Sequence, residues 1–317
     1  MDDSNKQRDR VHYRMINNTK LILVAASMSA GKSSLINALL GKEILPVGNE
    51  ATSSKVARIT VTAKKSPLAK AYSLSGTIAE SSKTINSEKI REWNTSDKIT
   101  AFEVIIPHSG SRLHSMLAGY TLIDTPGSNN SRNTSHKEIF INTVKTYPNS
   151  LILYVLNATQ LATTDDANII RSIREMNPKQ SVVFALNKVD ELDEERGETA
   201  KDYVVKASHY LEGLGYIKPT IVPLMAQSAL IAKKTLSQTE ICRRERNILN
   251  AELARFRENP FHLNSAATVP NVFKRNVRKR LAKISKGNVQ VMSPKELKIF
   301  IDYTGLSTVK ALITGAA

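Results

Sequence analysis

Short apolar runs alternate with longer amphipathic segments along most of the chain. Runs of Val, Ile and Leu bounded by turn residues predict strands, and apolar positions at helical spacing predict helices. The predicted strands are 21–25, 56–63, 69–74, 101–106, 120–123, 151–156, 182–186 and 220–224. The main predicted helices between them are 32–40, 136–145, 165–176 and 198–214. This alternation predicts an α/β fold with a mostly parallel central sheet and helices on both faces.

Residues 56–107 interrupt the alternation, because strands there follow one another with one short helix around Ser87–Trp93. Consecutive strands joined by short connections are typical of antiparallel pairing. We therefore predict an antiparallel extension at one edge of the sheet.

The pattern changes again after Leu230, where strand signals stop. Residues 235–256 predict a highly charged helix, and residues 259–270 form a break rich in Pro, Asn and Ser. A basic helix is predicted at 271–286 and a last helix at 294–303. The C-terminal region is thus predicted to be helical and basic.

Composition excludes several classes of protein. The chain has 317 residues, 41% of them hydrophobic, which suffices for a large core without disulfide or metal staples. The single cysteine, Cys242, cannot form an internal disulfide, and the six histidines have no metal-ligand spacing. The sequence shows no apolar run of membrane-spanning length and does not begin like a signal peptide. These features predict a cytoplasmic protein that is soluble or peripheral at a membrane.

The positive charge is concentrated near the C-terminus. The formal net charge is +16, and residues 231–317 hold 17 basic and 6 acidic side chains. Such an excess indicates a polyanionic partner, a membrane or a nucleic acid, or serves solubility alone.

The clearest chemical motif is Ala-Ser-Met-Ser-Ala-Gly-Lys-Ser-Ser at residues 26–34, between a predicted strand and a predicted helix. Small residues let backbone amides converge on phosphate oxygens, and the helix N-terminus adds partial positive charge. In such a P-loop, Lys32 reaches the β- and γ-phosphates and the Ser33 hydroxyl binds Mg²⁺. Ala26 stands where the pattern usually has glycine, which requires a negative φ there.

Two further motifs follow strands in the expected order. Asp124-Thr-Pro-Gly127 follows the strand 120–123, so that Asp124 can hold Mg²⁺ through water and the Gly127 amide can meet the γ-phosphate. Asn187-Lys-Val-Asp190 follows the strand 182–186. Asp190 can accept hydrogen bonds from guanine N1 and N2, whereas adenine would leave this carboxylate without partners. The three motifs together predict binding of GTP.

The phosphate motif and its surroundings resemble the dynamin family, especially its bacterial dynamin-like members. The resemblance rests on Ser29, the doubled serine Ser33-Ser34, the segments 35–41 and 45–52, and the stretches 157–165 and 297–312. It implies that Thr52 binds Mg²⁺ and becomes ordered with GTP, with Ser53 and Ser54 as alternatives. The long interval between Lys32 and Asp124 independently favours a large GTPase domain.

The expected site is therefore as follows. Catalytic candidates are Lys32, Thr52 and Gly127; phosphate- and base-binding candidates are Ser29, Ala30, Gly31, Lys32, Ser33, Ser34, Asn187, Lys188, Asp190 and Ala226; metal candidates are Ser33, Thr52 and Asp124. The guanine O6 is expected to meet a backbone amide of either Ala226 or Ala229. No residue is assigned to orient the attacking water, because Ser128 stands where Ras-type enzymes have glutamine and Met28 is apolar.

The resemblance divides the chain into a polar N-terminal segment (1–17), a dynamin-type GTPase domain (18–230), a helical basic insertion (231–293) and a closing helix of that domain (294–317). Dynamin-like proteins surround this domain with long helical segments, so the chain is expected to be either a piece of a longer protein or a short form.

Two functions follow. The first is a P-loop GTPase that hydrolyses GTP to GDP and phosphate with Mg²⁺, coupled to self-assembly as a homodimer across the domain or to membranes. The second is a nucleotide-switched binding module with negligible hydrolysis and a docking tail.

The basic helix 271–286 has its own alternatives, because Phe273, Val277, Leu281 and Ile284 form an apolar stripe along it. It either lies on an anionic membrane surface or packs this stripe on the protein, and nucleic acid is a weaker alternative because aromatic residues are not interleaved.

Overall fold

This computed structural model describes residues 20–47, 55–63, 66–108, 116–125, 134–284 and 293–315, with only the backbone at 134–137. A nine-stranded sheet runs through this part of the chain. Its order is β4-β3-β5-β2-β6-β1-β7-β8-β9. The strands are β1 Lys20–Ala26, β2 Val56–Thr62, β3 Leu68–Tyr72, β4 Ile78–Ser82, β5 Ala101–Pro107, β6 Tyr120–Asp124, β7 Leu151–Asn157, β8 Val182–Asn187 and β9 Thr220–Leu224.

The five strands from β6 to β9 in this order are all parallel, as the apolar pattern predicts. The extension beyond β6 is mixed. β2 pairs antiparallel with β6, and β3 pairs antiparallel with β4 and β5, but β2 and β5 are parallel. The sequence reading of consecutive antiparallel strands was thus incomplete, because the chain returns through β3, β4 and α3 (Ser87–Thr95) before β5 pairs with β2.

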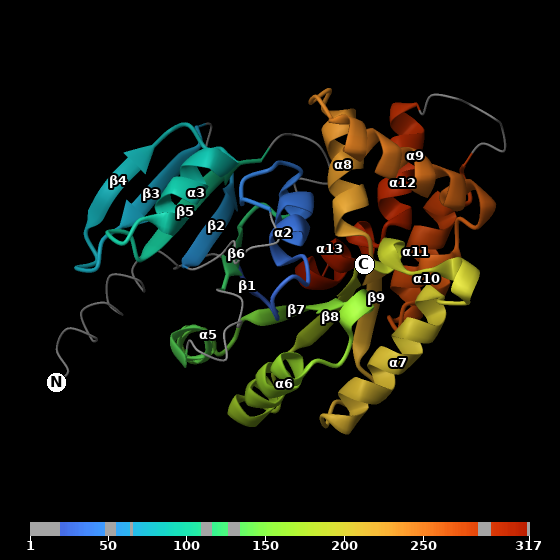
Figure 1. Ribbon diagram of the computed structural model, residues 1–317, viewed down its shortest axis with the longest axis horizontal. Coiled ribbons are helices and arrows are strands. Elements are labelled where there is room, and N and C mark those ends of the chain that lie inside the picture. Colours follow the sequence, from blue (N-terminus) through green and yellow to red (C-terminus); the bar gives the residue numbers. More distant parts are fainter. Residues whose placement is uncertain are drawn as a thin grey trace.

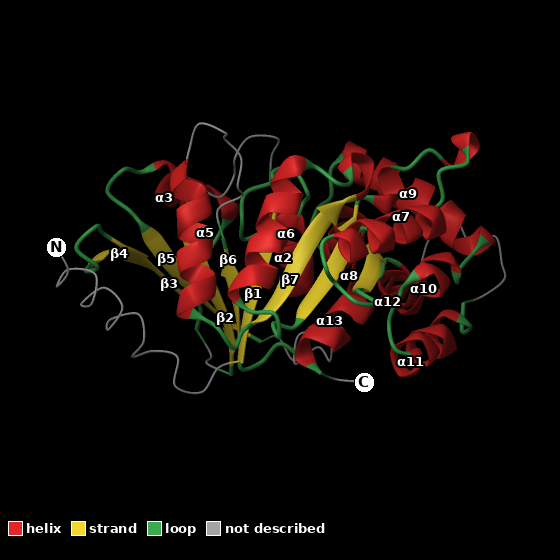
Figure 2. Cartoon of the chain, turned by 90° about the horizontal axis from the view of Figure 1, so that it is seen from below, coloured by secondary structure: helices red, strands yellow, loops and turns green. Residues whose placement is uncertain are grey.

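Helices cover both faces of the parallel part of the sheet (Figure 1). The remaining helices are α2 Lys32–Leu40, α5 Thr134–Thr146, α6 Thr164–Met176, α7 Ala200–Gly213, α8 Ala226–Leu236, α9 Arg243–Glu258, α10 His262–Ala266, α11 Asn271–Leu281, α12 Pro294–Tyr303 and α13 Leu306–Thr314. α2, α8, α12 and α13 pack against one another, while α5 and α6 form a separate pair. Figure 2 shows α8 to α12 gathered at the β9 end, away from the mixed extension.

The central strands form the core because they are buried on both faces. All five residues of β6 are buried, as are six of the seven in β7. Beside them, the Asn37 side chain closes the loop after α2. Its Oδ1 accepts from the amides of Ile44 and Leu45, both at 2.9 Å, and its Nδ2 donates to the Leu45 carbonyl at 2.7 Å. This loop leads toward the segment that contains Thr52.

The C-terminal helices differ most from the sequence prediction. The predicted helix 235–256 is two helices, because residues 237–242 between α8 and α9 are not helical. α8 begins before residue 230, and α10 lies in the predicted break. The closing helix is divided at Gly305, whose φ is +84° and whose added Cβ would lie 2.2 Å from the Pro223 carbonyl oxygen. A glycine is required there, and it separates α12 from α13.

The basic helix α11 uses its apolar stripe within the protein. Val277 and Leu281 are buried, and the helix packs against α12 and α13. Arg280 forms a two-point ion pair with Asp302, with Nε and Nη2 at 2.7 and 3.1 Å from the carboxylate oxygens. The geometry therefore favours the alternative in which the stripe packs on the protein, and the helix ends at Leu281 rather than at residue 286.

A helix needs about 20 apolar residues to cross the hydrocarbon core of a lipid bilayer. None of the helices in the described ranges is both long and apolar enough to do so.

Candidate functional site

The phosphate-binding loop connects β1 to α2 at the carboxyl edge of the parallel strands. Ala26 ends β1 in strand conformation, so its methyl group is tolerated where the motif usually has glycine. Ser29 adopts a left-handed conformation with φ of 58°, which a non-glycine residue rarely takes. Such strained residues cluster in ligand-binding loops. Gly31 is also left-handed, with φ of +87°.

Asn187 holds this loop against two other elements. The residue ends β8, where it pairs with Asn157 and Leu224 on the neighbouring strands, and it is 3% exposed. Its Nδ2 donates to the Ala30 carbonyl at 2.9 Å, and its Oδ1 accepts from the Ala226 amide at 3.0 Å. A Cβ added to Gly31 would lie 2.3 Å from this Nδ2. Asn187 is thus in contact with the phosphate loop, which requires glycine at position 31.

Lys32 and Asp124 form a buried ion pair where α2 begins and β6 ends. They are 92 residues apart in sequence, but β1 and β6 are paired so that Val24 lies opposite Asp124. The Thr125 hydroxyl donates to the Val24 carbonyl at 3.0 Å and fixes the end of β6. Ser33, next to Lys32, is also buried.

The oxygen atoms of Ser33 and Asp124 are of the kind that binds a magnesium ion. Mg²⁺ prefers oxygen ligands and usually combines one or two protein groups with water and substrate phosphates. Ser33 and Asp124 supply a hydroxyl and a carboxylate at one edge of the sheet. The described residues contain no cluster of three or more His, Cys, Asp or Glu side chains that could form a complete protein site.

The base-recognition motif lies at the end of β8. Lys188 is left-handed with φ of 66°, and its Nζ is 3.3 Å from a Glu191 carboxylate oxygen. The half-buried Asp190 carboxylate accepts a hydrogen bond of 2.9 Å from the Ser228 hydroxyl. Burial raises the pKa of Asp190, and the Ser228 hydrogen bond opposes this rise. The hydroxyl therefore stabilises the ionised carboxylate, whose two oxygens can only accept hydrogen bonds.

Ala226 and Ala229 are the two residues expected to contact guanine O6, and the backbone amide of each already donates a hydrogen bond within this structure. The Ala226 amide donates to Asn187, and the Ala229 amide donates to the Met225 carbonyl at 3.0 Å within α8. The other predicted residues of the phosphate loop, Ser29 and Ser34, are exposed and half-buried, respectively.

Two predicted site residues, Thr52 and Gly127, lie outside the described residues, as do Ser53, Ser54 and Ser128. The structure brings together the remaining candidates from the ends of β1, β6, β8 and β9.

Sequence reasoning missed two residues that support these loops. One is Ser228, which contacts Asp190. The other is Asp166, fully buried at the start of α6, which hydrogen-bonds Ser27 in the phosphate loop and accepts from the Tyr154 hydroxyl at 2.6 Å. The only local signal for Asp166 is its place three residues after the helix-capping Thr163.

A buried carboxylate on α9 lies beside the base loop. Burial raises the pKa of Glu252 to about 7, Arg255 opposes this rise, and Asp190 and Glu194 add to it. The folded state thus binds more protons than the unfolded state between the ordinary value of 4.5 and about 7. Stability should fall as pH rises through this window.

We therefore expect Glu252→Gln, which resembles the neutral carboxyl, to abolish this loss. Between about pH 5 and pH 8 the wild type should lose about 2–3 kcal/mol of unfolding free energy relative to the variant. Urea unfolding of both proteins at the two pH values measures the difference, in which contributions from other groups such as His262 cancel. If the difference in unfolding free energy between the two proteins is the same at both pH values, the raised pKa of Glu252 is contradicted.

Comparison with known proteins adds independent information. The model of the dynamin family matches residues 22–189. Dynamin-like protein A of Bacillus subtilis (strain 168) is 29% identical over 168 residues, which are 52% of this chain and 13% of that protein. Two solved chains of an oligomerised bacterial dynamin pair, described as sensing and tethering membranes over long range, share the fold at a TM-score of 0.52. They are 20% and 18% identical and cover 89% of this chain.

The chain spans 43% of the length of those two solved chains. The family match includes β1 from residue 22 onward, the phosphate loop, Asp124 and Asn187, and it ends one residue before Asp190. Because it covers more than half of the sequence and the observed sheet agrees with the bacterial dynamin fold, the chain belongs to the dynamin family.

Proposed function

We propose that this chain binds GTP and hydrolyses it to GDP and phosphate with Mg²⁺. Members of the dynamin family are GTPases. The observation that carries the proposal is the set of contacts among the strand-end loops. Lys32 pairs with Asp124, and Asn187 joins the phosphate loop to the first turn of α8. Of the residues in the proposed chemistry, Lys32, Asp124 and Asn187 therefore gather around the phosphate loop.

The phosphate groups would lie over residues 29–34, at the N-terminus of α2. Backbone amides there would donate to phosphate oxygens, and the helix dipole would favour their negative charge. Lys32 would exchange Asp124 for the β- and γ-phosphate oxygens. The Gly127 amide would contact the γ-phosphate.

The metal would be held by Ser33 and Asp124, with Thr52 joining after GTP binds. When bound, Mg²⁺ would offset the charge that develops on the phosphate oxygens during transfer. Release of Asp124 from Lys32 would leave its carboxylate ready for a metal-bound water. The Ser33 hydroxyl is already placed one residue beyond Lys32 at the start of α2.

Guanine would be recognised at the end of β8. Asp190 would accept from the N1 and N2 groups, and the Lys188 stem would pack on the ring. The first turn of α8 would supply an amide for O6 other than that of Ala226, which Asn187 holds, because the first amides of a helix lack intrahelical acceptors. Asn187 would act by holding this turn and the phosphate loop together.

The test is phosphate release from GTP at several protein concentrations, with Mg²⁺ and with a chelator in its place. Release that depends on Mg²⁺ and exceeds release from ATP is expected. A turnover per molecule that rises with concentration would support a homodimer across the domain. GTP binding without phosphate release at any concentration would contradict hydrolysis and favour the nucleotide-switched module.

A second candidate function is docking on an anionic membrane surface, as self-assembly and membranes are implied by the bacterial relatives. Arg275, Lys279 and Lys283 recur at four-residue spacing and are all exposed. The apolar stripe packs on the protein, with Val277 and Leu281 buried and Phe273 and Ile284 partly buried against the core. The three cations can therefore offer charge to a membrane, but the stripe is not available for insertion. Arg278 and Arg280 are excluded from it, since Arg278 lies over the Phe261 ring and Arg280 is paired.

We expect changing Arg275, Lys279 and Lys283 together to glutamine to weaken binding to anionic liposomes, since each surface cation contributes about 1 kcal/mol. Co-sedimentation at low and high salt measures this, with neutral liposomes as the control. Unaltered liposome binding by the triple variant would contradict this surface. Binding of RNA but not of liposomes would favour the nucleic-acid alternative.

A further inference from the structure

Helix α9 contacts the base-recognition loop from outside the region that matches the family. Arg255 Nη1 donates to the Asp190 carbonyl oxygen at 3.3 Å and to Glu252 Oε1 at 3.0 Å. The Asp190 side chain is held separately, by Ser228 on α8. Backbone and carboxylate of one residue are therefore held by two different helices.

The position of Arg255 is fixed by a buried partner. Glu252 is 5% exposed, and among the described residues its Oε2 has no hydrogen-bond partner. A buried carboxylate is costly unless a cation lies beside it. Arg255 supplies that cation while reaching the Asp190 carbonyl, so its side chain cannot move away without isolating Glu252.

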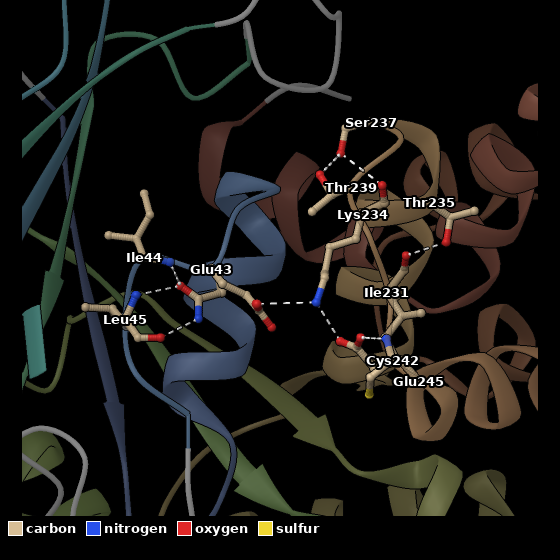
Figure 3. A network of polar contacts seen from close by, with 11 residues as sticks. Glu43, Ile44, Leu45, Ile231, Lys234, Thr235, Ser237, Thr239, Cys242 and Glu245 are labelled. Carbon is tan, nitrogen blue, oxygen red and sulfur yellow. Dashed lines mark hydrogen bonds and ion pairs between the residues drawn. The ribbon is translucent and has the colours of Figure 1, made fainter. Parts of the chain in front are cut away.

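The other end of α9 is anchored as well. Lys234 Nζ lies 2.7 Å from a Glu245 oxygen on α9 and 3.3 Å from a Glu43 oxygen in the loop after α2 (Figure 3). The helix thus connects this loop to the base-recognition loop. Both contacts resist movement of α9 relative to the nucleotide site.

The base loop needs such support because it contains strain. Lys188 takes the left-handed conformation without being glycine, which is favourable only where the surroundings enforce it. Two residues later, Asp190 must present both carboxylate oxygens to guanine at once. A small rotation of its backbone would leave one of the two hydrogen bonds unmade.

We propose that Arg255 is a positioning residue for base selection. It fixes the Asp190 backbone so that the carboxylate meets the N1 and N2 groups of guanine together. This inference rests on the proposed binding of GTP. It gives the helical insertion, which the family resemblance leaves unexplained, a role in nucleotide specificity.

The test compares the affinities of GTP and inosine triphosphate, which lacks the 2-amino group and can make only one of the two bonds. In Arg255→Ala, GTP affinity is expected to fall about tenfold, the size of one hydrogen bond to a charged group. Inosine triphosphate affinity should change less than about twofold. The control is Arg244→Ala, which removes an exposed arginine from the same helix and should alter neither affinity.

An equal change for the two nucleotides, or no change, would overturn the proposal, since a general structural role affects both. If the alanine variant does not fold, Arg255→Lys decides. Lysine keeps a cation beside Glu252 but is too short to bridge Glu252 and the Asp190 carbonyl. The ratio of GTP affinity to inosine triphosphate affinity should therefore still fall. If this ratio in the lysine variant equals that of the wild type, Arg255 does not position Asp190 for base selection. Failure of the wild type to prefer GTP over ATP would instead contradict the proposed function.

Discussion

Lys32→Ala is expected to lower kcat/KM for GTP by about 100-fold or more, the usual effect of removing one group that stabilises transition-state charge. Lys32 is the charged side chain that opens α2, and the phosphate loop places it beside Asp124. No other described side chain is assigned to the β- and γ-phosphates in this account. Steady-state phosphate release measures kcat/KM, and titration with a fluorescent GTP analogue measures the accompanying change in nucleotide affinity.

The same substitution removes a buried partner from Asp124, which is 1% exposed. A loss of folded stability must therefore be distinguished from a loss of catalytic turnover. The double variant Lys32→Ala with Asp124→Asn also neutralises the buried carboxylate that has lost this cation, and it is expected to recover most of the thermal stability, but not the turnover. Turnover at the wild-type level in either folded variant would contradict the phosphate-loop assignment.

Asp190→Asn is expected to weaken GTP binding by about 10- to 100-fold, because the amide keeps one acceptor oxygen and puts an NH2 donor where the second oxygen faced a guanine N–H. Xanthosine triphosphate should bind better to the variant than to the wild type, because the amide can donate to the 2-oxo group that replaces the 2-amino group. Competition between the two nucleotides measures this exchange of preference.

A matched control for this change is Glu191→Gln, which neutralises the adjacent exposed carboxylate that pairs with Lys188. It should leave the preference for GTP over xanthosine triphosphate intact. If Asp190→Asn weakens both nucleotides equally, Asp190 is not the group that reads the 2-position of the base.

Most of the sheet could be predicted because its central strands are continuous apolar runs with clear turn boundaries. β7 and β9 begin at the predicted residues. β4 was missed because Ile78–Ser82 is an exposed edge strand with a polar composition, and three of its five residues are exposed. Its pairing with β3 is specified by tertiary contacts that no local pattern records.

The C-terminal helices were harder to predict for a different reason. α8 is buried on most sides, so its apolar residues give no amphipathic period from which a start can be read. The charged pattern that follows continues across the break at residues 237–242 and suggested one helix. The break at Gly305 depends on the nearby Pro223 carbonyl, a contact between segments far apart in sequence.

The candidate site shows the same division. Phosphate- and base-binding residues could be predicted because their chemistry needs fixed residue types at fixed spacing within one loop. Ser228, Asp166 and Arg255 act through contacts made only after folding, at positions without a motif. Their contacts are therefore visible only in the folded structure.

The most direct test of the central claim is calorimetric titration of this chain with GTP and with ATP, in the presence of Mg²⁺, followed by product analysis of the same samples. The account predicts one GTP site, conversion of GTP to GDP, and ATP binding weaker by about tenfold or more, since adenine leaves Asp190 without partners. Equal affinities for ATP and GTP, or intact GTP after prolonged incubation at all protein concentrations, would contradict it.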